Sequence, residues 1–180
     1  MTQAAPRRVC MVCSGNICRS PMAEVVLRAR LDEAGEGGRF VVDSAGTGDW
    51  HAGEHADPRT TAALLAAGYD TSAEAHVARA FARDWFARYD VVVAMDRGHE
   101  RSLRALAGTP EERAKVKLLR TFAPGAGTDG TGPGAARRGD LDVPDPYYDD
   151  DTAFADSLRI VEEAMPGFAA WLVETDAGHR

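Results

Sequence analysis

The sequence predicts an α/β fold, a single three-layer domain in which a four-stranded parallel sheet is flanked by helices. Apolar stretches of strand length alternate along the chain with segments of helical periodicity, an order typical of parallel strands joined by helical crossovers. The chain has 180 residues, of which 44% are hydrophobic, which is enough for one domain with an ordinary core. Because ligands of such sheets bind at the carboxyl ends of the strands, the loop after the first strand is predicted to carry the site.

Each element is predicted from local pattern. The first strand, residues 9–12, is a short apolar run, and Pro21 suits the first turn of the helix that follows. Asp57 and Pro58 begin a second helix, which ends before Gly68. The remaining strands are expected at residues 40–42, 90–95 and 115–119, and the remaining helices at residues 80–88, 98–107 and 152–173.

Three stretches of the domain (1–180) are predicted to lack regular structure. Residues 1–7 are expected to form a flexible tail, and residues 177–180 a frayed end. Residues 125–139 contain six glycines and one proline without apolar periodicity. This composition predicts a mobile surface loop just ahead of the acidic segment near residue 145.

A short loop between the first strand and its helix has a thiol, Cys13, at one end and a guanidinium, Arg19, at the other. Gly15 can take a positive φ, the loop amides can converge on an anion, and the helix dipole adds positive potential. Arg19 can bind two phosphate oxygens at once. The same potential favours the thiolate form of Cys13, so the loop is predicted to bind a phosphate and to activate a nucleophile.

The string Cys13-x-Gly15-Asn16-Ile17-Cys18-Arg19-Ser20-Pro21-Met22-Ala23-Glu24 resembles, almost letter for letter, the active-site loop of the low-molecular-weight protein tyrosine phosphatases. Further motifs of that family follow in order: Asp43-Ser44-Ala45-Gly46-Thr47, Trp50, Asp57-Pro58-Arg59-Thr60, His76-x-Ala78-Arg79, Ala94-Met95-Asp96 and Asp142-Val143-Pro144-Asp145-Pro146-Tyr147-Tyr148. The resemblance implies hydrolysis of phosphotyrosine through a cysteinyl-phosphate. Cys13 would be the nucleophile, Arg19 the phosphate clamp and Asp145 the general acid.

The chemistry of a phosphomonoester agrees with these roles. The reaction needs an in-line nucleophile, positive charge around the equatorial oxygens and a proton for the departing phenoxide. Asp145 lies between two prolines, which disfavour helix and favour an extended loop that can aim one carboxyl into a cleft. The nearby acids Asp142, Asp149, Asp150 and Asp151 are interpreted as a solvated rim.

The resemblance also implies the supporting residues. The phosphate-binding set is Ser14, Gly15, Asn16, Ile17, Cys18, Arg19 and Ser20. Ser20 is expected both to cap the helix and to donate to the thiolate, while Asn16 and Ser44 hold the loop in shape. Asp96 and His76 are expected to support the site without touching substrate. The aromatic residues Trp50, Tyr147 and Tyr148 are expected to wall a slot for a flat phenyl ring, with core packing as the alternative for the tyrosines.

Composition limits the possible partners. The net charge of −7 disfavours nucleic acid, and no apolar run approaches the length of a membrane span. Without a leader segment the protein is expected to be cytoplasmic. Three cysteines, all within the first 18 residues, argue against a disulfide framework; Cys10 is expected to face the core. The arginines at positions 79, 83, 88, 97, 101 and 104 are interpreted as solvated helix faces.

No cofactor is predicted. The segment His51-Ala52-Gly53-Glu54-His55 matches a metalloprotease pattern that requires a helix, but its flanking glycines and Pro58 favour a loop, so no metal site is expected. The expected partners are phosphotyrosine proteins or peptides, with inorganic phosphate as product and competitive ligand; the oligomeric state stays open.

Other activities are open on the same residues. An arsenate reductase would need a further cysteine, and none follows Cys18. Protein arginine phosphatases resemble this loop but carry Thr where this chain has Ile17. A catalytically inactive phosphotyrosine-binding module is a third alternative. Cys18 is expected either to protect Cys13 by forming a disulfide after oxidation, making the protein redox-sensitive, or only to fill space.

Overall fold

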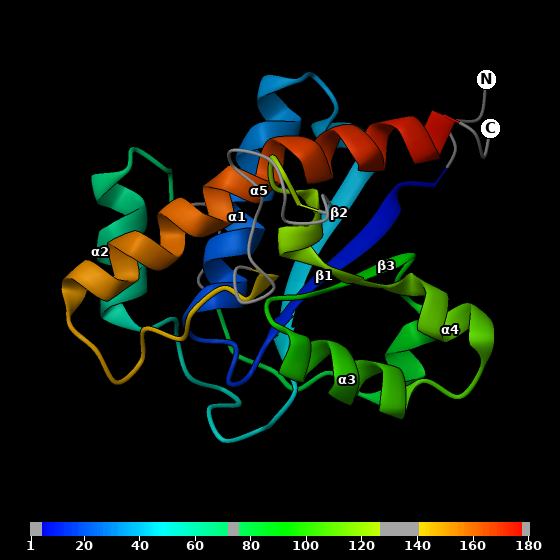
Figure 1. The fold of residues 1–180 in the computed structure, drawn as a ribbon, viewed down its shortest axis with the longest axis horizontal. Helices are drawn as coiled ribbons and strands as arrows, with labels where there is room; N and C mark the ends of the chain where they lie inside the picture. Colours follow the sequence, from blue (N-terminus) through cyan, green and yellow to red (C-terminus); the bar gives the residue numbers. More distant parts are fainter. Residues whose placement is uncertain (1–4, 72–75, 127–140, 178–180) are drawn as a thin grey trace.

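The computed structural model describes residues 5–71, 76–126 and 141–177, and Figure 1 shows a central sheet between two layers of helices. The sheet is formed by β1 (Arg7–Cys13), β2 (Phe40–Gly46), β3 (Val91–Ala94) and β4 (Val116–Leu118), in the order β2-β1-β3-β4. All three strand pairs are parallel. The predicted α/β architecture with four parallel strands is confirmed.

Helices cover both faces of the sheet. One face is covered by α1 (Arg19–Glu33), α2 (Pro58–Ala66) and the long α5 (Asp151–Ala177). The other face is covered by α3 (Arg97–Leu106) and the short α4 (Pro110–Lys115), with an aromatic cluster around Phe86. Alternate residues of β1 enter the two cores: Met11 belongs to the first and Cys10 to the second, because side chains alternate across a strand. Cys10 therefore faces a core as predicted, and burial raises the pKa of its thiol.

The prediction of an α-helix over residues 80–88 is wrong. Ala80 bridges Gly46, which extends the edge of the sheet, and only a 3-10 helix, η2 (Arg83–Ala87), follows. The spacing of apolar residues in this segment reflects aromatic packing. The centroid of the Phe81 ring lies 5.0 Å from that of Phe86 and 5.7 Å from that of Trp85. Tertiary packing has overridden the local pattern.

Several predicted boundaries also differ. Arg7 is the first residue of β1, not part of a tail, and its guanidinium donates hydrogen bonds to Leu172 O and Thr175 Oγ1 of α5. The second strand continues to Gly46 and α5 to Ala177, while α4, capped by Thr109, is an additional helix that the sequence pattern does not predict. Two further 3-10 helices are η1 (Gly37–Arg39) and η3 (Leu119–Phe122). Most of the predicted glycine-rich loop and of both chain ends lies outside the described residues.

Four of the arginines predicted to be solvated are exposed, at positions 83, 88, 101 and 104, but Arg79 and Arg97 are not simply solvated. Arg79 lies outside any helix; its Nε donates to Ser44 O and its Nη2 lies 3.5 Å from Asp43. Arg97 forms an ion pair with Asp142 at 2.8 Å. Arg79 therefore binds β2, and Arg97 binds the segment that leads to Asp145. Among the helices of the described residues, none is long and apolar enough to cross a membrane.

Candidate active site

The loop between β1 and α1 has its carbonyl groups tied to surrounding segments. Cys13 O and Ser14 O accept from Thr47 N and Gly48 N, at 2.8 and 3.1 Å, and Ile17 O accepts from Asp57 N at 2.9 Å. Within the described part of the chain, the backbone N–H groups of residues 14–18 have no protein acceptor. These amides precede the N-terminus of α1 and are therefore donors available to an anion.

Asn16 holds this loop in shape. It is fully buried and has a left-handed backbone, with φ of 59°. Its side-chain Nδ2 donates to Ser20 Oγ and Ser44 Oγ, both at 2.9 Å, and its Oδ1 accepts from Arg79 N at 3.0 Å. Its carbonyl accepts from His76 Nε2 at 2.6 Å. Asn16 and Ser44 are thus in direct contact, and His76 binds the loop backbone.

Gly15 has a different role from the one predicted. It is absent from the positive-φ residues of the described chain, so the left-handed turn belongs to Asn16. Instead, a Cβ on Gly15 would lie 2.6 Å from His51 Cδ2, closer than side chains approach. A side chain at position 15 would therefore displace the His51 ring, which packs against the loop.

Cys13 is the last residue of β1 and is 3% exposed. Its Sγ lies 3.0 Å from Ser20 Oγ, the predicted partner of the thiol. Ser20 also accepts from Asn16 and lies within hydrogen-bond distance of Ala45 O, at 3.3 Å. With one proton to donate, the Ser20 hydroxyl can direct it to the sulfur whenever that sulfur carries negative charge.

Arg19 is 3% exposed and its guanidinium is nearly saturated. Nη1 donates to Asp96 Oδ2 at 2.8 Å and to Val143 O at 3.1 Å. Nη2 donates to Asp145 Oδ2 at 3.0 Å and to Ser14 Oγ at 3.3 Å. Nε is buried without a partner in the described structure. This free N–H is available to a ligand, and Asp96, predicted as support, anchors the opposite side of the guanidinium.

Asp145 reaches the site from the loop between η3 and α5. Its side chain is 43% exposed, and the loop is tied down by Val143 N donating to Met95 O at 2.9 Å and by Ser157 Oγ donating to Pro144 O at 3.0 Å. Asp142, predicted to belong to a solvated rim, instead accepts several hydrogen bonds from Arg97, and this contact lowers the pKa of its carboxyl. Asp142 therefore ties the segment just before Asp145 to the first residue of α3.

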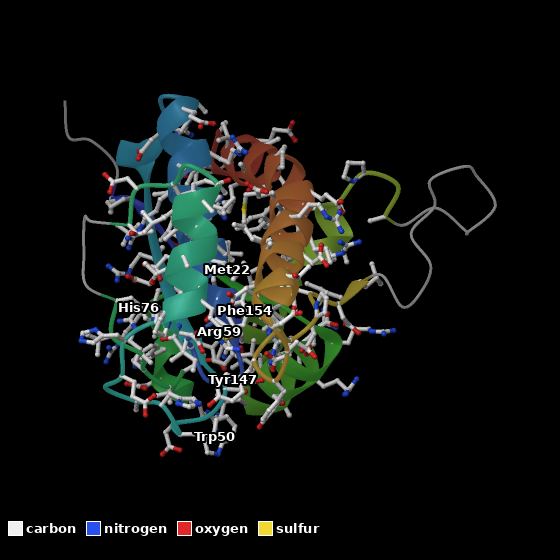
Figure 2. All side chains as sticks on the ribbon, turned by 90° about the vertical axis from the view of Figure 1, so that its left-hand side faces the viewer. Met22, Trp50, Arg59, His76, Tyr147 and Phe154 are labelled. Carbon is white, nitrogen blue, oxygen red and sulfur yellow. The ribbon has the colours of Figure 1, made fainter. Side chains whose placement is uncertain are left out.

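A cavity of about 460 Å³ joins these groups. Cys13, Arg19 and Asp145 line it together with the aromatic residues Trp50, Tyr147 and Tyr148. Trp50 is 70% exposed and Tyr148 is 91% exposed, so these two rings stand at the mouth and are not core residues. Figure 2 shows Trp50 and Tyr147 at the same end of the molecule. The residues predicted to wall a slot are therefore brought to one opening.

A cysteine, an arginine and an aspartate that line one cavity, beside loop amides without an acceptor among the described residues, are the groups needed for thiol attack on a phosphomonoester. The model of the family described as "Low molecular weight phosphotyrosine protein phosphatase" matches residues 8–177. The chain belongs to this family.

Two relatives and one solved structure support the assignment to this family. A low molecular weight protein-tyrosine-phosphatase of Streptomyces coelicolor is 52% identical over 171 residues, covering 95% of this chain and 96% of the relative. Low molecular weight protein-tyrosine phosphatase A of Mycobacterium tuberculosis is 42% identical over 169 residues, covering 94% and 93%. A crystal structure of protein tyrosine phosphatase from Entamoeba histolytica aligns with a TM-score of 0.81 at 26% identity, covering 94% of this chain and 99% of that chain.

Sequence reasoning missed three residues at this phosphatase-family site. His51 lines the cavity, with Nδ1 bound to Glu54 at 2.8 Å. Arg59 donates to the carbonyls of Tyr147 and Asp149, and Figure 2 shows it between Tyr147 and the Phe154 ring, over which its guanidinium lies at 4.3 Å. His99 is buried behind Ser14. The Asp-x-x-His spacing at the start of α3 was the only sequence signal for His99.

The His51 to His55 segment is a loop, as predicted. The two imidazoles have different partners, because His55 Nδ1 binds His76 O at 3.0 Å while His51 binds Glu54. No group of three metal-binding side chains occurs among the residues that the structure describes.

Proposed function

We propose that this chain hydrolyses phosphotyrosine monoesters in two steps, with Cys13 as nucleophile, Arg19 as phosphate clamp and Asp145 as general acid. The observation that carries the proposal is the convergence of these three side chains on one cavity, beside the amides of residues 14–18, which have no acceptor among the described residues. Amides and guanidinium together provide the positive environment that a phosphoryl group requires as charge develops on its oxygens.

In the first step the Cys13 sulfur attacks phosphorus, and the bond from phosphorus to the phenolic oxygen breaks. Asp145 donates a proton to that oxygen, so the phenol leaves neutral. In the second step water attacks the cysteinyl-phosphate, Asp145 accepts a proton from the water, and the S–P bond breaks to release inorganic phosphate. Ser20, 3.0 Å from the sulfur, stabilises the departing thiolate by donating its hydroxyl proton in a hydrogen bond.

Phosphotyrosine is the proposed substrate class because the rings of Trp50 and Tyr147 line the cavity above Cys13. A flat phenyl ring can pack between aromatic side chains, whereas the shorter phosphoserine would leave its phosphate out of reach of the sulfur. Ile17, in place of the threonine of the arginine phosphatases, supports the same choice.

The proposal treats the chain as one phosphatase domain, acting on phosphotyrosine proteins or peptides and inhibited by its product phosphate. It includes a cytoplasmic location and sensitivity to oxidation at Cys13. The three cysteines are all free, which is typical of proteins of reducing compartments.

The decisive experiment is rapid-quench mass spectrometry with a phosphotyrosine peptide. Wild type is expected to accumulate phosphate on Cys13, while Cys13→Ser is expected to be almost inactive yet still to bind the peptide, since the amides and Arg19 remain. Phosphate on another residue, or unimpaired turnover by Cys13→Ser, would overturn the mechanism. Faster turnover of a phosphoarginine peptide, or equal turnover of a phosphoserine peptide, would overturn the substrate class.

A further inference from the structure

A buried histidine outside the motifs discussed above lies directly behind the phosphate loop. His99 is 5% exposed and belongs to the first turn of α3. Its Nε2 lies 2.9 Å from Ser14 Oγ, and its backbone N–H donates to Asp96 Oδ1 at 2.8 Å. Ser14 occupies the variable position of the Cys-x-Gly string, and the resemblance places it in the phosphate-binding loop without giving its side chain a role of its own.

Ser14, His99 and Asp96 connect the two Nη atoms of Arg19 through a chain of hydrogen bonds. Ser14 Oγ accepts from Nη2 at 3.3 Å, and Asp96 Oδ2 accepts from Nη1 at 2.8 Å. His99 lies between these two acceptors, because its ring contacts Ser14 and its backbone N–H donates to Asp96. Loss of His99 would therefore free one of the two side chains that hold the guanidinium from the protein side.

The direction of the hydrogen bonds follows from counting protons. His99 Nδ1 is buried, has no well-aligned partner in the described structure and lies 3.2 Å from Asp96 Oδ1. An unprotonated Nδ1 would place its lone pair against a carboxylate, so the proton belongs on Nδ1. Nε2 is then an acceptor, and Ser14 donates its single proton to it. The serine oxygen is left as an acceptor directed at Arg19.

We propose that Ser14 and His99 act as one positioning unit for the phosphate clamp, holding Nη2 of Arg19 in the orientation in which it binds a phosphoryl oxygen beside the free Nε. The unit does not touch the reacting atoms. It lowers the freedom of the guanidinium before the ligand arrives, which strengthens phosphate binding in the ground state and the transition state alike. This inference rests on the proposed function for its link to turnover, but its ligand-binding part can be measured without turnover.

The test compares His99→Leu, Ser14→Ala and the double variant by calorimetric titration with inorganic phosphate. Each single variant is expected to raise the Kd of phosphate about tenfold, the difference equivalent to about 1.4 kcal/mol. The double variant is expected to be within twofold of the singles, because both changes break the same unit. Ser14→Thr, which keeps a hydroxyl, should recover most of the affinity lost in Ser14→Ala.

Steady-state kinetics with an aryl phosphate supplies a readout that simple destabilisation would not move. KM is expected to rise with the phosphate Kd while kcat falls less than threefold, the signature of lost uniform binding. Leu103→Ala is the matched control, because Leu103 is a buried residue of the same helix without a contact to Arg19 among the interactions of the described residues. It should lower stability and leave the phosphate Kd within twofold of wild type.

Two results separate this inference from the proposed function. If wild type hydrolyses phosphotyrosine but Ser14→Ala and His99→Leu bind phosphate within twofold of wild type, the positioning unit is refuted. The unit is refuted equally if Leu103→Ala weakens phosphate binding as much as those two variants do. If the variants weaken phosphate binding as expected but wild type does not hydrolyse phosphotyrosine, the positioning unit stands and the proposed function fails.

Discussion

Replacing Asn16 tests how the phosphate loop keeps its shape, because this residue combines buried side-chain hydrogen bonds with a left-handed backbone, and two substitutions can separate their contributions to stability. Its side chain makes three hydrogen bonds: those to Ser20 and Ser44 are buried, and the one from the backbone N–H of Arg79 is partly buried. At about 1 kcal/mol each, their loss in Asn16→Gly is expected to lower the free energy of unfolding by about 3 kcal/mol. Asn16→Ala loses the same bonds and must also hold a left-handed backbone, at a further cost of about 1–2 kcal/mol.

The glycine variant also has a more flexible unfolded chain, which offsets about 0.5–1 kcal/mol of that difference. Asn16→Ala is therefore expected to be about 1 kcal/mol less stable than Asn16→Gly, the reverse of the usual order in regular structure. Urea unfolding measures both, and aryl-phosphate turnover should fall in both variants because the amides lose their alignment. Gly68→Ala is the control: φ there is 88° and the added Cβ meets nothing, so it should lose stability and keep full activity. An alanine variant as stable as the glycine variant would refute the role of the left-handed backbone.

Four further outcomes are expected. Asp145→Asn should slow cleavage by ~10² to 10⁴, with a smaller loss for leaving groups that need little protonation; equal losses across a series of substituted phenyl phosphates would mean that Asp145 only holds the loop. Burial and the nearby Arg19 lower the pKa of His99 from 6.5 to about 4, so its neutral form stabilises the fold fully above pH 6.5, and up to roughly 3 kcal/mol is lost as the pH falls towards 4. Urea unfolding of His99→Leu should lack that part of the acid dependence. After peroxide and then a thiol reductant, wild type should recover activity and Cys18→Ser should not, since Cys18 would trap the oxidised Cys13 as a disulfide with loss of water; equal recovery, with no such link in a peptide map, would make Cys18 a packing residue only. Trp50→Ala should raise KM for a phosphotyrosine peptide about fivefold through lost ring contact, and an unchanged KM in steady-state assays would remove Trp50 from the slot.

Cys18 illustrates how burial modifies a prediction drawn from spacing. The sequence places it five positions from Cys13, and the structure buries it and raises the pKa of its thiol to about 12, mainly by desolvation. A thiol with so high a pKa is a slow nucleophile at neutral pH. Disulfide formation is therefore expected to require opening of the loop.

The parts predictable from sequence are those specified by local chemistry. The Asp57 side chain caps α2 and accepts from Arg59 N at 2.9 Å, with Pro58 in the first turn, as their order in the sequence indicates. The loop from Cys13 to Arg19 is a continuous segment between a buried strand and a helix, so its position at the strand end followed from the alternation of elements. Such features depend on residues within a few positions of one another.

The features that sequence patterns miss depend on contacts across the fold. Arg97 and Asp142 are 45 positions apart, and Ser14 and His99 are 85 apart. Charge patterning along a segment cannot reveal that two such residues meet, so it assigns both the arginine and the aspartate to solvated surfaces. The helix prediction for residues 80–88 fails for the same reason: Phe81 and Phe86 pack on the sheet from a bridge and a 3-10 turn, and their spacing imitates a helix.

The ion pair between Asp145 and Arg19 links the two halves of the proposed mechanism. Nη1 of Arg19 donates its hydrogen bonds to Asp96 and Val143. Nη2 donates one hydrogen bond to Ser14 and the other to Asp145, at 3.0 Å. A phosphoryl group that takes both Nε and Nη2 must displace the aspartate from the guanidinium. Because the prolines on either side restrict the backbone of Asp145, the displaced carboxyl moves mainly about its own side-chain torsions, within the cavity that holds the leaving group. Binding of the phosphate would thereby free the Asp145 carboxyl to face the leaving oxygen.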